Sequence, residues 1–414
     1  MTYFDLAALF LGLVGVVGWT NVRFFRLPTA TVMVLAGLAG AGLLMAARAW
    51  APAGAVAERL VEAIRSVDFQ RTVLGYFLAF LLFAGSIQVS LADLRQRTLA
   101  VAGLATLGVL TSTLLVGVGL WLAAKGLKVE LGLAWAIVFG ALISPTDPIA
   151  VLAAVQHGKL SKTIASVLQG EALFNDGVGI VIFTASLAIA AGGAELKPNS
   201  AIASVFAEAA GGAAVGGLLA AVAIAMMRAI DDYAVEVGLS VALAAGAYAL
   251  AGALGASGPI AVVVAGLLVG NLGVRTAMSQ TTQRYVRGFW TLVDELLNAV
   301  LFLLLGLELL VVPVAAPMIG LWGAAIVLVL LARLAVVAPL GTFLRLRRAE
   351  PGAGLLLAWG GLHGALSLAL ALSLPEGQVK ALVLSTTFAV VIVSVVVQGA
   401  TFGPLAARLA KPPG

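Results

Sequence analysis

Residues 139–183 read FGALISPTDPIAVLAAVQHGKLSKTIASVLQGEALFNDGVGIVIF, two apolar segments joined by a short polar connection. Each segment contains carboxylates where a membrane helix normally has hydrocarbon side chains: Asp147 in the first, Glu171 and Asp176 in the second. A charged side chain at the centre of a bilayer costs about 2.5–3.5 kcal/mol on insertion scales, so such residues are rare and usually functional. We therefore expect these two segments to build a binding site for a cation and a proton.

The composition indicates a helical protein that crosses a membrane many times. Of the 414 residues, 62% are hydrophobic and only 10% are charged, whereas about a quarter of the residues of a soluble domain are charged. Apolar runs long enough to cross a bilayer recur along the whole chain, and a membrane β-barrel would instead show short alternating segments. Cysteine is absent, which excludes disulfides and thiol chemistry. The basic residues are spread over loops, so no nucleic-acid partner is expected.

The sequence predicts an all-α polytopic membrane protein with about thirteen transmembrane helices. The expected spans are 4–21, 28–46, 72–90, 99–124, 131–155, 162–190, 200–227, 233–253, 258–272, 289–312, 318–342, 352–374 and 380–406. Lys and Arg are more frequent in the loops that lie inside when the N-terminus is outside, so we expect the N-terminus out and the C-terminus in. Few residues follow the last span, so we expect a single membrane domain over 1–414, with no soluble C-terminal regulatory domain.

The fifth span contains a sequence that should interrupt its helix, Ser144-Pro145-Thr146-Asp147-Pro148. Each proline removes a backbone donor and clashes with the carbonyl four residues earlier. The unwound backbone would leave carbonyl oxygens beside the Asp147 carboxylate, as in secondary transporters, where broken helices near the midplane occur in both of two inverted repeats. The alternative is a proline-kinked helix whose Asp147 only hydrogen-bonds a neighbour.

The acidic residues of the sixth span point in different directions. At 100° per residue, Glu171 and Asn175 share a helix face, and Asp176 is turned about 140° from Glu171. We expect Asp176 to face the fifth span and the ion, and Glu171 to face another helix. Arg333 is the only charge in the eleventh span. We favour a structural Glu171–Arg333 pair, because an unpaired buried charge is expensive, over a transport role for Arg333 or snorkelling to an interface.

The twelfth span has three glycines around a histidine and a serine, in Trp359-Gly360-Gly361-Leu362-His363-Gly364-Ala365-Leu366-Ser367, which predicts a second unwound segment. If the fourth to sixth and eleventh to thirteenth spans are inverted repeats, the two breaks cross. Asp147 could then offset the positive helix N-termini, and a protonated His363 the negative C-termini. The tenth span carries Asp294, Glu295, Asn298 and Glu308. For these residues we favour the polar ends of a dimer-facing or interfacial helix.

Five segments together resemble the prokaryotic sodium/proton antiporters of the cation/proton antiporter-1 (NhaP-like) family. They are FGALISPTDPIAV (139–151), GEALFNDGVGIVIF (170–183), GLLVGN (266–271), ELLNAVLFLLLGLEL (295–309) and WGGLHGALSLALALSLP (359–375), in the order found in the family. The resemblance implies a multi-pass homodimer in the prokaryotic cytoplasmic (inner) membrane. It also implies a transport core at about 99–190 and 318–406 and a dimerisation scaffold at about 1–90 and 200–312.

The resemblance also implies the site and the activity. The expected protein is not an enzyme and has no resident cofactor; its partners are the lipid bilayer and a monovalent cation. Na⁺, or Li⁺, would be exchanged for H⁺ at Asp147 and Asp176 with oxygens from Thr146. Asn175 would take the Asn of the family's Asn-Asp pair, which suggests electroneutral 1:1 exchange. Glu171 and Arg333 would form a buried ion pair, and Ser144 and His363 would modulate the site.

Two positions depart from the family pattern. Ala172 stands where the family often has a Ser that ligates the ion, so water or a backbone carbonyl would replace that ligand. His363 stands where the family often has Arg, so activity should fall as rising pH deprotonates it.

The expected mechanism is competition between the cation and the proton for Asp176, assisted by Asp147, with alternating access by movement of the core. The rival interpretations are K⁺/H⁺ exchange by the same fold, a channel, and an intramembrane aspartyl protease, which would need a Gly-x-Gly-Asp pattern at these acids.

Overall fold

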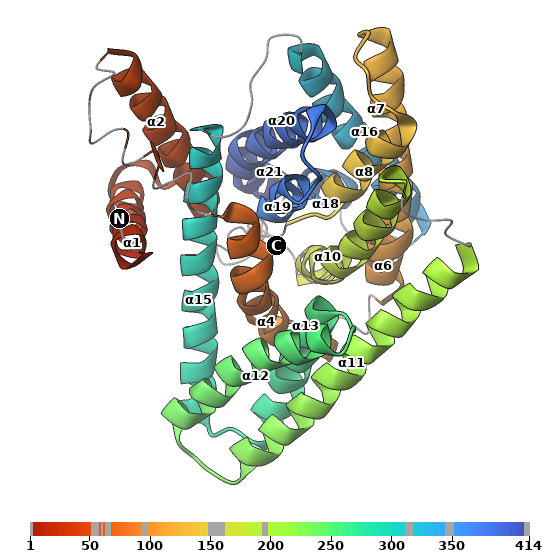
Figure 1. Ribbon diagram of the computed structural model, residues 1–414. Coiled ribbons are helices and arrows are strands. Elements are labelled where there is room, and N and C mark those ends of the chain that lie inside the picture. The colour runs from red at the N-terminus through yellow and green to blue at the C-terminus, as the bar shows by residue number, and fades with distance from the viewer. Residues whose placement is uncertain are drawn as a thin grey trace.

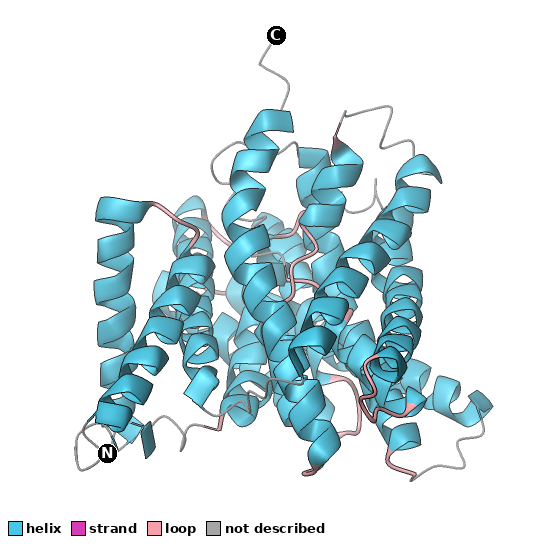
Figure 2. Cartoon of the chain, turned by 90° about the horizontal axis from the view of Figure 1, so that it is seen from above, coloured by secondary structure: helices cyan, strands magenta, loops and turns pink. Residues whose placement is uncertain are grey.

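The computed structural model describes residues 3–50, 58, 61–62, 68–92, 98–147, 162–192, 198–310, 318–343 and 352–409. Over these residues the regular structure is helical (Figure 2), apart from one isolated antiparallel bridge between Asp147 and Leu362. In the same part of the chain, 10 helices are long and apolar enough to cross a membrane. The predicted all-α membrane class is therefore confirmed. Residues 148–161, which include Pro148, lie outside the described ranges.

The helices follow the chain as α1 (Tyr3–Thr20), α2 (Thr29–Trp50), α4 (Leu78–Gln88), α6 (Thr98–Gly103), α7 (Val109–Gly126), α8 (Leu133–Ile143), α10 (Lys162–Ala190), α11 (Pro198–Arg228), α12 (Tyr233–Ala253), α13 (Gly258–Leu268), α14 (Val274–Thr276), α15 (Gln280–Leu307), α16 (Ile319–Phe343), α18 (Ala353–Trp359), α19 (Ala365–Leu372), α20 (Gln378–Val393) and α21 (Ala400–Leu409). Several spans also contain π-helical stretches, at Asn21–Phe25, Arg71–Phe77, Leu104–Gly108, Val269–Gly273 and Ser394–Gly399, and α15 ends in a 3₁₀ turn at Glu308–Leu310.

The helices form two packed groups, and α10 contacts both of them. Figure 1 shows α11, α12 and α13 on one side of the molecule and α7, α16 and α20 on the other. In the first group α13 packs against α4, α11 and α12, while α15 packs against α2, α4 and α12. In the second, α8 packs against α7 and α10, and α16 packs against α7, α18 and α20. Helix α10 contacts α8 of the second group and α4 and α13 of the first.

Glycines bring several helix backbones into direct contact. A Cβ atom on Gly37 of α2 would lie 2.8 Å from the Cα of Gly306 in α15. A Cβ atom on Gly140 of α8 would lie 3.0 Å from the backbone nitrogen of Gly117 in α7. Any larger side chain would push these pairs apart, and such close approach is how membrane helices gain packing energy.

Two non-helical stretches, here called the interruptions, face each other: one follows α8 and the other separates α18 from α19. Helix α8 ends at Ile143, and the chain is non-helical from there to Asp147. Between α18 and α19 the chain is non-helical from Gly360 to Gly364. The backbone N–H of Asp147 donates to the carbonyl of Leu362 at 2.7 Å. The predicted unwinding at both places is present, and one segment satisfies the backbone of the other.

Helix α15 begins nine residues before the predicted span that starts at residue 289. Ser279 caps it, with its hydroxyl accepting the backbone N–H of Thr282 at 3.3 Å. The first turns are polar, so hydropathy detects only the later, apolar part of the helix. The helix is 28 residues long, and Asp294 lies at its middle rather than near its end.

Candidate ion-binding site

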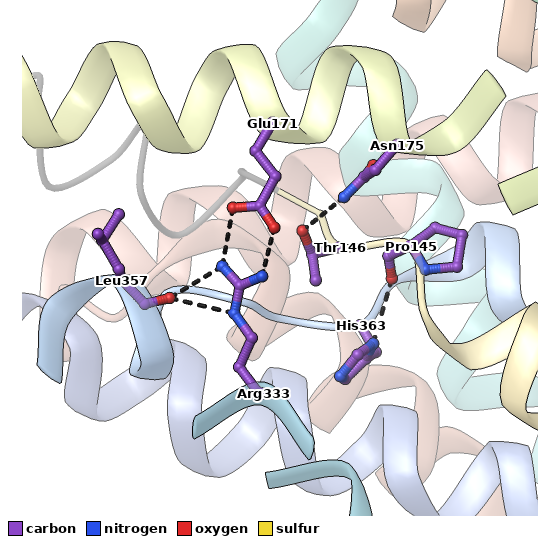
Figure 3. A network of polar contacts seen from close by, with 7 residues as sticks. All are labelled: Pro145, Thr146, Glu171, Asn175, Arg333, Leu357 and His363. Carbon is purple, nitrogen blue, oxygen red and sulfur yellow. Dashed lines mark hydrogen bonds and ion pairs between the residues drawn. The ribbon is translucent and has the colours of Figure 1, made fainter. Parts of the chain in front are cut away.

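Glu171 of α10 and Arg333 of α16 form a buried ion pair (Figure 3). The Nη2 atom of Arg333 donates to Oε2 of Glu171 at 2.8 Å, and Nη1 donates to Oε1. The Nε and Nη2 atoms also donate to the carbonyl of Leu357 at 3.2 and 2.9 Å. Leu357 is in the last turn of α18, where carbonyls lack partners in their own helix. One guanidinium therefore joins α10, α16 and the end of α18.

The pair is desolvated, and the backbone beside it makes room for it. The side chains of Glu171 and Arg333 are only 2% and 10% exposed. A Cβ atom on Gly361 would lie 2.9 Å from Cζ of Arg333, so a larger residue there would displace the guanidinium. The second interruption therefore packs directly on the guanidinium. The structure brings together the two charges that the sequence analysis paired.

Asn175 follows Glu171 by one turn on α10. It connects α10 to the interruption after α8. Its Nδ2 atom donates to Oγ1 of Thr146 at 2.8 Å, and both side chains are buried. The Oδ1 atom of Asn175 is also buried and has no hydrogen-bond partner among the described residues. A buried carbonyl oxygen without a partner is uncommon in native proteins and needs an explanation. This oxygen can accept a hydrogen bond or ligate a cation.

His363 links the two interruptions. Its Nδ1 atom lies 3.2 Å from the carbonyl oxygen of Pro145, which can only accept, so the ring donates there. Its backbone N–H donates to Oγ of Ser394 at 2.9 Å. A neutral imidazole can make the bond to Pro145, so this contact does not require the protonated ring suggested by the sequence.

Ser144 is turned toward its own helix and α7. Its hydroxyl donates to the carbonyl of Gly140 at 2.6 Å and lies 3.2 Å from Oγ1 of Thr113. These contacts hold the end of α8 against α7. Ser144 therefore supports the interruption.

Asp147 and Asp176 line one cavity of about 130 Å³, together with Thr146. The two carboxylates are close enough to interact electrostatically. A Cβ atom on Gly364 would lie 2.9 Å from Cγ of Asp147, so this glycine leaves the space that the carboxylate occupies. Ala172 also lines the cavity. The structure thus brings the two acids together from different segments, as the helix geometry of residues 171–176 predicted.

A second set of polar residues, which the sequence analysis did not assign to the site, lines the same cavity. Asp294 and Asn298 of α15 are in its lining, with Gln88, Gln169 and Ser367. The Nδ2 atom of Asn298 donates to Oδ1 of Asp294 at 3.0 Å. The signal that could have found them is the spacing of Asp294 and Asn298, which places both on one face of α15. The expected span starts at residue 289, which places Asp294 in its polar end.

Long apolar helices around two facing interruptions, with carboxylates in a cavity between them, define a membrane transporter for small cations. The chain matches the family described as "Sodium/hydrogen exchanger, transmembrane" over residues 9–408. It belongs to that family, which confirms the resemblance found in the sequence.

The relatives of the chain include named antiporters that match over most of their length. It is 42% identical to the Na(+)/H(+) antiporter NhaP of Pseudomonas aeruginosa, over 98% of this chain and 96% of that protein. It is 38% identical to the Na(+)/H(+) antiporter NhaH of Halobacillus aidingensis, over 83% of this chain and 85% of that protein. The structure of the sodium proton antiporter MjNhaP1 from Methanocaldococcus jannaschii at pH 8 has the same fold, with a TM-score of 0.70 at 21% identity and 98% coverage of both chains.

Proposed function

We propose that this protein exchanges Na⁺ for H⁺ across a membrane, at a site formed by Asp147 and Asp176. The observation that carries the proposal is that the two carboxylates, from separate segments, line one cavity whose described lining contains no Lys or Arg. Membership of the sodium/hydrogen exchanger family and the names of the relatives support the same activity.

The ion ligands are the two carboxylates, the hydroxyl of Thr146 and the amide of Asn175. The unpartnered Oδ1 atom of Asn175 supports its assignment, because a cation would supply the missing partner. Oxygen atoms are the ligands that hard cations prefer. A cation and a proton cannot both occupy the same carboxylate, so binding of one releases the other. We place Na⁺ against Asp147, Asp176 and Thr146, with water or a backbone carbonyl at the position that Ala172 leaves open.

Charge neutralisation around the site supports electroneutral 1:1 exchange. Arg333 compensates the charge of Glu171 through two charge-assisted hydrogen bonds. Asn175 is neutral and is bonded to Thr146. The carboxylates of Asp147 and Asp176 are then the charged groups to which we assign the binding of Na⁺ and H⁺. Glu171 and Arg333 have a structural role, and His363 and Ser144 adjust the geometry of the interruption.

A topology of thirteen spans accounts for the helices. We count the 10 long apolar helices as ten crossings and the short apolar helices α4 and α8 as two more. The interrupted pair of α18 and α19 supplies one more crossing, and its partner is the interruption after α8, so the two broken spans would cross. In this arrangement the N-terminus is outside and the C-terminus inside the cytoplasmic membrane.

The division into two groups of helices supports a mechanism of alternating access. The cavity is lined by α4 and α15 on one side and by α10, α19 and the end of α8 on the other. Movement of the second side against the first would expose Asp147 and Asp176 to each face of the membrane in turn. We assign the core to about 99–190 and 318–406, the scaffold to about 1–90 and 200–312, and a homodimer contact to the scaffold.

Purified protein in liposomes tests the proposal. A pH-sensitive dye inside acid-loaded vesicles should report proton efflux when Na⁺ is added, with Li⁺ and K⁺ compared at the same concentration. We expect Na⁺ to drive proton efflux and Asp176→Asn to abolish it. If K⁺ alone drives efflux, the protein is a K⁺/H⁺ antiporter. If Asp176→Asn transports like the wild type, the assigned site is wrong.

A further inference from the structure

The cavity that contains Asp147 and Asp176 continues to a third carboxylate, Asp294, which sits on the opposite group of helices. Asp294 is at the middle of α15, which packs against α2, α4 and α12. Asn298, one turn later on α15, lines the same cavity. Asp294 therefore reaches the same space from a different structural unit.

Trp290 fixes the position of this part of α15. Its side chain is fully buried, and its ring centroid lies 4.6 Å from that of Phe83 in α4. Its Nε1 atom donates to Oγ of Ser240 in α12 at 2.9 Å. Asp294 follows Trp290 by four residues, so it lies on nearly the same helix face. The anchored tryptophan holds the carboxylate in place at the cavity wall.

The charges in the cavity are of one sign. Its described lining contains the carboxylates of Asp147, Asp176 and Asp294 and no basic side chain. Glu295, next to Asp294 and exposed, adds a further negative charge that acts on Asp294. Clefts lined by one sign of charge between low-dielectric walls concentrate ions of the opposite sign. The cavity as a whole therefore attracts cations.

Two amide side chains of the cavity lining supply neutral oxygens: Asn298, which contacts Asp294, and Gln88 of α4. Asn298 uses its Nδ2 atom to donate to Asp294, which leaves its own carbonyl oxygen available. Gln88 of α4 likewise uses its Nε2 atom to donate to the carbonyl of Ala84 at 2.9 Å. Both amides line the cavity. A carboxylate with two amide oxygens is a suitable ligand set for a partly hydrated monovalent cation.

We propose that Asp294, with Asn298 and Gln88, forms a recruitment site for the monovalent cation, distinct from the site at Asp147 and Asp176. The cation occupies it while still partly hydrated and then passes to the two transport carboxylates. This inference rests on the proposed exchange function. Because Asp294 lies on the α4 and α15 side of the cavity, we expect the recruitment site to serve one membrane face only. It sets the apparent affinity for the cation from that face, and it takes no part in the coupled exchange itself.

The test is a comparison of Asp294→Asn with the wild type in right-side-out and inverted membrane vesicles, with Na⁺ added outside. We expect the KM for Na⁺ to rise about fivefold in one vesicle orientation and to stay unchanged in the other, with the maximal rate retained. The difference should shrink when choline chloride is added, because salt of about 0.1 M screens charges more than about 10 Å apart. Glu130→Gln is the control: it removes an exposed carboxylate that is not part of the cavity lining, and we expect no change in KM.

Three results would overturn the recruitment site. The first is an unchanged KM in both orientations, the second an equal rise in both, and the third a loss of maximal rate as complete as in Asp176→Asn. If Asp294→Asn does not accumulate as folded protein, Asn298→Ala provides the second variant, and we expect a smaller rise in KM in the same orientation; no rise there would overturn the site. Failure of the proposed exchange function is recognised separately, by the absence of Na⁺-driven proton movement in the wild type.

Discussion

Replacing Arg333 by Met should destabilise the protein more than replacing any exposed charged residue. The change removes two hydrogen bonds to Glu171 and two to the carbonyl of Leu357. Removing one partner of a buried ion pair costs about 3–5 kcal/mol, because the other charge stays buried without compensation. The unsatisfied Leu357 carbonyl adds about 1–3 kcal/mol. The double replacement with Glu171→Gln removes the buried charge and should recover part of this loss.

Intrinsic tryptophan fluorescence during heating, in one detergent, gives the apparent unfolding temperature of each variant. We expect the order wild type, then the double variant, then Arg333→Met as the least stable. Arg287→Met is the control, because Arg287 is exposed on α15 and such replacements usually change stability by less than about 0.5 kcal/mol. If Arg333→Met unfolds with the wild type, or if the double variant is less stable than Arg333→Met, the pair does not hold α10, α16 and α18 together.

Two glycine replacements test the site and the packing with matched controls. Gly364→Ala puts a methyl group against the carboxyl of Asp147, so Na⁺-driven proton efflux should be lost. Gly354→Ala, where the new methyl group has nothing within 4 Å, is the control and should transport normally. Equal transport by both would show that the Asp147 carboxylate can move without consequence. Gly37→Ala forces α2 away from α15 and should lower the unfolding temperature. Gly42→Ala, on the same helix, meets nothing within 4 Å and should leave the unfolding temperature unchanged. Equal unfolding temperatures for the two variants would refute the close contact.

Features set by local geometry were predictable from the sequence. The interruption before Asp147 follows from the chemistry of Pro145, which cannot continue the hydrogen-bond ladder of α8. The separate directions of Glu171 and Asp176 follow from the 100° turn per residue of any α-helix. The pairing of Glu171 with Arg333 follows from the high cost of an isolated charge in hydrocarbon. Each of these inferences needs only one segment or one energetic rule.

Features set by the mutual placement of helices were not predictable. Asp294 enters the cavity because Trp290 anchors α15 against α4 and α12, and no pattern within α15 specifies that contact. The contact between Asn175 and Thr146 depends in the same way on how α10 lies against the end of α8. Hydropathy also placed the start of α15 too late, because its first turns are polar.

The dependence of the Na⁺ KM on pH, measured in liposomes with the wild-type protein, tests the central claim most directly. If Na⁺ and H⁺ compete for Asp176 and Asp147, the KM should rise as the pH falls, by up to about tenfold per pH unit at the acid end, while saturating Na⁺ restores the same maximal rate. A KM that stays constant while the maximal rate falls would show that the proton acts at a different site, and the competitive mechanism would be wrong.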